Sequence, residues 1–217
     1  MSKKSLLKPL AAAALLAATG AAQAAITIYT DQASFLAAVI SPVGVDTFAG
    51  FSIIGTTPSP ITRAAGALGY TADTGPAGSF FGAGSPANPW LSTNTATDTV
   101  SFFNFTGGVG ALGGNFFGSD IGGNFAGGSV TLSATDADGT VEQTITGATT
   151  SSFLGFVSST GALSSASLFS VQPGSGLPLW PTADNLTLAA AVPEPETYGM
   201  MLAGMALIAS MARRRRG

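Results

Sequence analysis

The sequence predicts an all-β protein whose body is an antiparallel β-sandwich, with one short helix near the start of the body and a separate hydrophobic helix at the C-terminus. Short β-prone stretches are separated by Gly, Ser, Thr, Asn, Asp and Pro, and the body has no long stretch of helical periodicity. Val130, Leu132 and Ala134 alternate with small hydroxyl residues, which is typical of a strand with one buried and one solvated face.

The body begins with a predicted strand at residues 26–29 and a short helix directly after it. Thr30 is placed to cap this helix, which we expect to start at Asp31. It is the one helix that we expect in the body. Three side chains of this segment are predicted to face the core: Phe35, Leu36 and Val39.

Another strand is predicted at residues 43–51. Residues 56–60 are a predicted loop, because closely spaced prolines cannot donate to a ladder of backbone hydrogen bonds. Residues 76–89 are predicted to form a second long loop.

The second half predicts seven successive strands at short spacing, which favours two packed sheets. Adjacent Phe residues are expected to place their rings on both sides of a strand, at positions 80–81, 102–103 and 116–117. The predicted strands are residues 97–105, 110–117, 128–135, 140–146, 152–157, 166–171 and 185–189.

The N-terminal residues have the order of a secretory signal peptide. Lysines come first, an apolar stretch follows at residues 10–18, and small residues close the segment. We expect residues 1–24 to be removed, with Ala22 and Ala24 before the cleaved bond and Ala25 after it. The body is then residues 25–191.

The last 26 residues, 192–217, form a tail with three parts. A proline-bracketed acid comes first, an apolar run follows, and a basic cluster closes the tail. These parts are the motif residues Val192, Pro193, Glu194 and Pro195, the apolar run 198–212, and the arginines Arg213, Arg214, Arg215 and Arg216.

The charge of the tail predicts its orientation, because positive charge accumulates on the cytoplasmic side of a membrane, so the body is expected outside. The 15 apolar residues would form a helix of roughly 22 Å, against a hydrocarbon core of about 30 Å. Such a short transmembrane helix suits a tail that is held briefly and then removed.

This three-part tail resembles the PEP-CTERM sorting domain of exopolysaccharide-producing Gram-negative bacteria, which is also catalogued as the ice-binding protein C-terminal domain. The resemblance implies passage through the export translocon, transient anchoring in the inner membrane, and cleavage near the motif by an exosortase-type processing protease. The mature chain is then expected at the cell surface or secreted. The body also resembles the jelly-roll-like bodies of this family at residues 110–117, 153–157 and 183–187.

The body is acidic, since it holds nine Asp and Glu residues and a single basic residue, Arg63. Its net charge of about eight negative charges, without a basic patch, excludes nucleic acid as a partner. An acidic surface is compatible with cation binding or with solubility among polyanions.

The chain contains no Cys and no His. Their absence excludes Ser-His-Asp and Cys-His catalysis and ordinary zinc sites. No pair of acids stands out as a glycosidase pair. We therefore expect a non-enzymatic structural or adhesive component of an exopolysaccharide matrix, with no required cofactor, and we keep a glycan-active enzyme as an alternative.

Asp136, Asp138 and Glu142 resemble a fragment of a calcium loop, with Asp184 or Asp120 as further ligands. The segment lies between two alternating strands, where Asp and Gly favour a hairpin turn. We prefer the turn and keep calcium binding as an alternative.

Two further alternatives concern ligands of the body. Threonines alternate at positions 93, 95, 97 and 99, and in an extended strand they would line one face that meets ice or sugar. Aromatic rings near an amide could form a platform that stacks on a sugar, but we prefer packing as the explanation for these residues. The candidates for this sugar platform are Trp90, Trp180, Tyr70 and Asn88.

Overall fold

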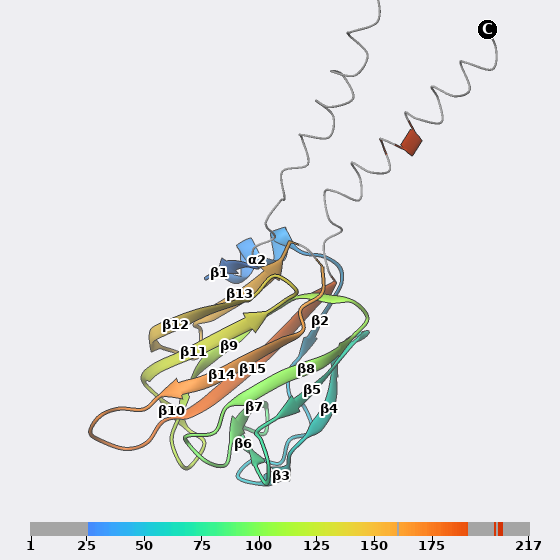
Figure 1. Ribbon diagram of the computed structural model, residues 1–217. Coiled ribbons are helices and arrows are strands. Elements are labelled where there is room, and N and C mark those ends of the chain that lie inside the picture. The colour runs from blue at the N-terminus through green and yellow to red at the C-terminus, as the bar shows by residue number, and fades with distance from the viewer. Residues whose placement is uncertain (1–25, 160, 191–201, 203, 206–217) are drawn as a thin grey trace, which may run out of the picture.

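The computed structural model describes residues 26–159, 161–190, 202, 204 and 205 (Figure 1). The predicted signal peptide and most of the predicted C-terminal helix lie outside these residues. Of the C-terminal apolar run, Leu202, Gly204 and Met205 are described, and they are helical.

The body is an all-β sandwich of two antiparallel sheets, which confirms the predicted fold class. The larger sheet has nine strands in the order β1-β13-β9-β15-β7-β6-β3, with β10 beside β9 and β2 beside β15. Its strands are β1 (Ile26–Tyr29), β2 (Ile40–Asp46), β3 (Thr56–Pro58), β6 (Ser79–Ser85), β7 (Asn88–Thr93), β9 (Val109–Ser119), β10 (Phe125–Ala126), β13 (Phe153–Ser158) and β15 (Trp180–Ala190).

The smaller sheet has six strands in the order β12-β11-β14-β8-β5-β4. Hydrophobic side chains of both sheets meet between them and form the main core, which includes Phe102, Phe116 and Leu132. The six strands are β4 (Ile61–Ala65), β5 (Leu68–Asp73), β8 (Val100–Thr106), β11 (Gly128–Thr135), β12 (Thr140–Ala148) and β14 (Ser165–Val171).

The period-two pattern of the sequence explains the six-stranded sheet. In β11, Val130, Leu132 and Ala134 are buried, and Ser133 and Thr135 lie on the half-exposed outer face. The central strands β9 and β15 are buried almost throughout because both faces of the nine-stranded sheet are covered there.

The helix α2 (Gln32–Ala38) covers part of the outer face of the nine-stranded sheet. Its N-cap is Asp31 and not Thr30, because the Asp31 carboxylate accepts a hydrogen bond of 2.8 Å from the Ser34 N–H. Phe35 is buried as predicted, against strand glycines such as Gly155, where a Cβ would lie 2.4 Å from the Phe35 ring. Leu36, predicted to face the core, is 43% exposed because neighbouring helical residues point in different directions.

Two predicted loops are wrong in part, because they contain strands. Residues 56–58 form β3, an edge strand that tolerates a proline at its end. The predicted loop 76–89 contains β6 and the start of β7. The strands β4 and β5 and the two-residue β10 were not predicted, and β2 ends at Asp46 instead of reaching residue 51.

The body starts and ends at the same end of the nine-stranded sheet. Ile26, at the start of β1, pairs with Ser158, and the neighbouring Val157 pairs with Ala111 of β9. Ala190, at the end of β15, pairs with Val109 of the same strand β9. The first and last described strands of the body therefore bring both of its ends to one side of the molecule (Figure 1).

Candidate functional site

The C-terminal tail follows directly from a central strand of the sandwich. Ala190 is paired both with Val109 of β9 and with Ile40 of β2. Leu188 and Ala189 are fully buried. Val192, the first residue of the predicted motif, stands two positions after Ala190, so the motif is joined to the folded sheet without a long spacer.

The residues of the predicted sorting motif, of the arginine cluster and of the signal cleavage site lie outside the described part of the chain. Within the described residues, the structure holds no helix that is long and apolar enough to cross a membrane. The predicted motif, arginine and cleavage-site residues that lie outside the described part of the chain are Val192, Pro193, Glu194, Pro195, Arg213, Arg214, Arg215, Arg216, Ala22, Ala24 and Ala25.

The calcium candidates lie in and beside the hairpin between β11 and β12, which is the predicted turn. Asp136 accepts hydrogen bonds from the N–H of Asp138 at 2.9 Å and of Gly139 at 3.2 Å, and from the Ser158 hydroxyl at 2.8 Å. Glu142 lies on β12 opposite Ser133. In residues 26–159 and 161–190 no group of three or more His, Cys, Asp or Glu residues is arranged to hold a metal ion. The hydrogen bonds from the Asp138 and Gly139 N–H groups place the Asp136 carboxylate in the turn.

Asp120 and Asp184, the further calcium candidates, also lie in separate surroundings. The Asp120 carboxylate accepts hydrogen bonds from the N–H of Gly122 at 2.8 Å and of Asn124 at 2.9 Å. These bonds, led by that from Asn124, hold the pKa of Asp120 below its usual value. Both bonds go to Oδ1 and close a short surface loop.

The alternating threonines do not form a row on a strand. Thr93 ends β7 and is fully buried, and residues 94–99 form bends and a turn between β7 and β8. The extended threonine row expected at positions 93–99, on which the alternative of an ice or sugar face depends, is therefore wrong, because the chain leaves the extended conformation after Thr93.

The predicted sugar platform is brought together only in part. Tyr70 is fully buried in the main core of the sandwich, so it is wrongly assigned to the platform. Trp90 is half-buried, and its ring packs edge-on against Phe117 at a centroid distance of 4.8 Å. Trp180 is also half-buried and donates its indole N–H to the Asn94 carbonyl at 3.3 Å.

Asn88 and Asp184 meet beside Trp90, although they are far apart in the chain. The Asn88 side-chain amide donates a hydrogen bond of 3.3 Å to Asp184 Oδ2. Asp184 is 4% exposed, and its Oδ1 atom and the buried indole N–H of Trp90 have no hydrogen-bond partner among the described residues. Burial raises the pKa of Asp184 above its usual value, against the opposing effect of the bond from Asn88.

This arrangement has the chemistry of a polar contact point at an aromatic surface. The Asp184 Oδ1 atom and the Trp90 indole N–H are both buried, and buried polar groups are costly unless a hydrogen bond, including one to water, satisfies them. Trp90 adds a half-exposed apolar ring, and Asn88 adds an exposed amide. We name Asn88, Trp90 and Asp184 the Asp184 cluster.

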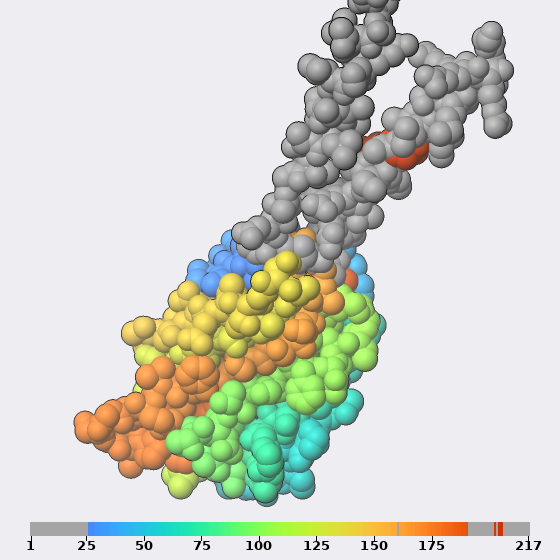
Figure 2. All heavy atoms as spheres, viewed as in Figure 1, coloured from blue at the N-terminus to red at the C-terminus, as the bar shows by residue number. Residues whose placement is uncertain are grey.

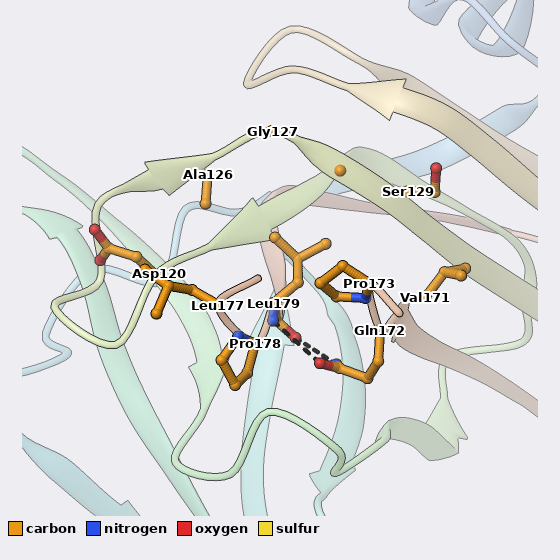
Figure 3. A pocket seen from close by; sticks show the side chains of 11 residues that line it. Asp120, Ala126, Gly127, Ser129, Val171, Gln172, Pro173, Leu177, Pro178 and Leu179 are labelled. Atoms are coloured by element: carbon orange, nitrogen blue, oxygen red, sulfur yellow. Dashed lines mark hydrogen bonds between the residues drawn. The ribbon is translucent and has the colours of Figure 1, made fainter. Parts of the chain in front are cut away.

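A separate pocket of about 430 Å³ lies between the loop 172–179 and the strands β10 and β11 (Figure 3). Leu179, Pro173 and Pro178 supply apolar walls, and Asp120 stands at one side. Gln172 fixes the loop, because its side chain donates to the Leu179 carbonyl at 2.7 Å and accepts from the Leu179 N–H at 3.1 Å. Asp120 is the one acid among the residues that line this pocket.

The body of the chain is a β-sandwich, and a motif, an apolar run and arginines follow its last strand in the sequence. Residues 191–216 match the family model described as the PEP-CTERM protein-sorting motif. The match begins at the residue after Ala190 and covers the tail, not the body. No curated protein and no solved structure matched the chain. The motif supports export, sorting to the cell surface and processing by exosortase, a membrane protease.

Proposed function

We propose that the chain is a non-enzymatic structural or adhesive component of an exopolysaccharide matrix, delivered through the inner membrane and then released or attached at the cell surface. The observation that carries this proposal is the sorting motif at residues 191–216, which begins where the central strand β15 ends. The tail is the sorting signal, and the sandwich is the part of the chain that remains outside the inner membrane.

A short membrane stage follows from the length of the tail. The apolar run 198–212 would span roughly 22 Å as a helix, less than the hydrocarbon core of about 30 Å. Arginines at its end favour the cytoplasmic side, so the body is held outside until cleavage.

The surface charge of the body supports a place among polysaccharides. Residues 25–191 contain nine acidic residues and one basic residue, Arg63, which forms an ion pair with Asp46. Self-repulsion keeps such a body soluble and apart from its copies in a polyanionic matrix.

A non-catalytic role is supported by the absence of His and Cys from the sequence and by the engagement of several carboxylates in the fold. Asp46, Asp120 and Asp136 each accept two or more hydrogen bonds from neighbouring groups. These contacts fix each carboxylate in place, which is a structural use of the group.

Carbohydrate binding by the body is the second candidate function, and the Asp184 cluster favours it. A sugar hydroxyl can bond to the exposed Asn88 amide while its ring lies on Trp90, and the buried Asp184 carboxylate holds that amide in place. Binding sites with few convergent polar groups on an apolar wall are common for small ligands.

Sedimentation with matrix polysaccharide from the host tests both functions. The mature chain is expected in the polysaccharide fraction, and Asn88→Ala weakens its retention if the Asp184 cluster binds glycan. Asn124→Ala is the matched control, because Asn124 is also exposed and also bonded to an Asp carboxylate. A wild-type chain that stays free in the medium contradicts the matrix role, and turnover of the glycan contradicts the non-enzymatic role.

A further inference from the structure

Exposed apolar side chains gather where the tail leaves the body. Leu36 on α2 and Ile40, Val43 and Val45 on β2 are each between 40% and 46% exposed. The β2 residues line the last part of β15, since Ile40 pairs with Ala190 and the other two pair with nearby residues of that strand. We name Leu36, Ile40, Val43 and Val45 the α2–β2 strip.

The strip continues a small hydrophobic cluster to the surface. Val43 pairs with Ala189, which packs with Phe35 on the outer face of the nine-stranded sheet. Gly44 and Asp46, which alternate with Val43 and Val45, are buried on the inner side. Figure 1 shows α2 and β2 beside the end at which β15 finishes. The apolar side chains of β2 therefore face outward next to the tail.

The strip is also a gap in the charge of an acidic body. No residue from Gln32 to Val45 carries a charge. Asp46, the next acid along the chain, is 5% exposed and bound by Arg63. An anionic bilayer surface repels the rest of the body. The strip is therefore the part of this end that can approach lipid at least cost.

The length of chain after Ala190 limits how far the body can stand from a membrane. Seven residues, 191–197, separate Ala190 from the apolar run. At about 3.3–3.6 Å per residue they reach at most about 25 Å, and prolines reduce that figure toward about 22 Å. The headgroup layer takes up part of this distance. A body held so closely lies with some face near the headgroups.

We propose that the α2–β2 strip rests on the bilayer surface while the tail is still attached. This inference rests on the membrane stage of the proposed function. Burial of the strip in the headgroup region fixes which side of the sandwich faces the membrane, and it holds the motif at the surface where a membrane protease acts. Cleavage of the tail then leaves the strip alone too small for stable attachment, so the body departs.

The chain has no cysteine, so single-cysteine labelling tests the inference directly. The full chain with Glu194→Ala, which is expected to retain its tail, is placed in vesicles of phosphatidylethanolamine and phosphatidylglycerol. An environment-sensitive fluorophore is attached at Val45→Cys, with Leu177→Cys as the matched control. Leu177 is also apolar and exposed, and its loop projects from the end of the body far from α2 (Figure 2). Ala206→Cys reports on the tail.

The Val45 label is expected to shift to shorter wavelength and to be quenched by nitroxide-bearing lipid, and the Leu177 label is expected to do neither. A Val45 label that behaves like the Leu177 label, while the Ala206 label is quenched, overturns the inference and leaves the proposed function standing. If the Ala206 label is not quenched, the membrane stage fails and the inference fails with it. A shifted Val45 label that lipid does not quench overturns the inference in favour of a second copy.

Folding of each labelled chain is checked by its thermal unfolding. Val43→Ser serves as a second test without a label, because it reduces the apolar area of the strip and is expected to weaken protection of β2 from protease in the vesicles. Unchanged protection contradicts the inference.

Discussion

Arg63 and Asp46 join the two sheets of the sandwich at their edges. Arg63, in β4 of the six-stranded sheet, donates from Nε to Asp46 Oδ2 at 2.6 Å and from Nη2 to Asp46 Oδ1 at 2.7 Å. Asp46 ends β2 of the nine-stranded sheet and also accepts the Tyr70 hydroxyl at 2.7 Å. The guanidinium lies over the rings of Phe48 and Phe51. The single basic residue of the body therefore has a structural use.

Removal of the guanidinium leaves a buried carboxylate without its charge partner. Arg63→Ala is expected to lower the free energy of unfolding by about 3 kcal/mol, measured by urea denaturation. Tyr70→Phe removes one hydrogen bond and is expected to cost about 1 kcal/mol. Arg63→Lys recovers only part of the loss, because lysine lacks the planar fork. An Arg63→Ala protein as stable as the wild type contradicts the role of this pair.

Asp184 and Asp46 are expected to respond to pH in opposite directions. Burial raises the pKa of Asp184 above its unfolded-state pKa of about 3.8. The contribution of this side chain to the free energy of unfolding is therefore most favourable below that unfolded-state pKa, and it is lost as pH rises through the folded-state pKa. Asp184→Asn is therefore expected to gain stability relative to the wild type between about pH 4 and pH 7. Thermal unfolding at several pH values measures the difference, and a gain that grows toward low pH contradicts the assignment.

Asp46→Asn is the control with the opposite sign. Burial raises the pKa of Asp46, but the hydrogen bonds from Arg63 and Tyr70 outweigh burial and leave the pKa below its ordinary value. The stability that this carboxylate contributes is present above the unfolded pKa and is lost as pH falls through the folded pKa. Asp46→Asn is therefore expected to lower the free energy of unfolding more at pH 7 than at pH 3.

Gly44 allows β2 to approach the end of β4 closely. A Cβ at Gly44 would lie 1.9 Å from the Ala65 carbonyl oxygen, which is a backbone atom and cannot rotate away. Gly44→Ala is expected to cost about 3 kcal/mol or more of unfolding free energy. At Gly174 a Cβ meets nothing within 4 Å, so Gly174→Ala is the control and is expected to leave stability nearly unchanged. Equal stabilities of the two variants would contradict the close approach.

Asp136 is expected to stabilise the β11–β12 hairpin without calcium. Asp136→Ala removes the acceptor for two turn N–H groups and the Ser158 hydroxyl, and the expected loss is about 2 kcal/mol. The melting temperature of the wild type is expected to be the same with calcium and with a chelator. A rise in melting temperature on adding calcium, absent in Asp136→Ala, would instead support the calcium alternative.

The sequence predicts the second half of the body well, because its strands are local and periodic. The predicted strand at 128–135 matches β11, and the predicted turn at Asp136 joins β11 to β12. The first half is less regular, since prolines stand at the ends of β3 and near the start of β7. Proline suggests a loop, but edge strands and strand ends accept it. Pairing with strands that are distant in the sequence decides whether such a segment forms a strand or a loop, and a single sequence does not show this pairing.

Some site residues are recognised from a local sequence pattern, and others are brought together only by the fold. The tail has a local order of motif, apolar run and arginines that a sequence shows directly. Asp184 and Asn88 are 96 positions apart, and only the arrangement of β7 beside β15 brings them together. Tyr70 shows the reverse error, because its aromatic ring suggested a platform and the fold buries it. The exposed side of β2 depends on register, which the sequence leaves open.

The most direct test of the central claim is the intact mass and location of the mature chain from its own host. The wild-type chain is expected outside the inner membrane, beginning at Ala25 and lacking the arginines. Glu194→Ala is expected to retain the tail, whereas Glu196→Ala, a neighbouring acid outside the motif residues 192–195, is the matched control and loses it. A wild-type chain that keeps its C-terminal arginines in the inner membrane would contradict sorting by this tail.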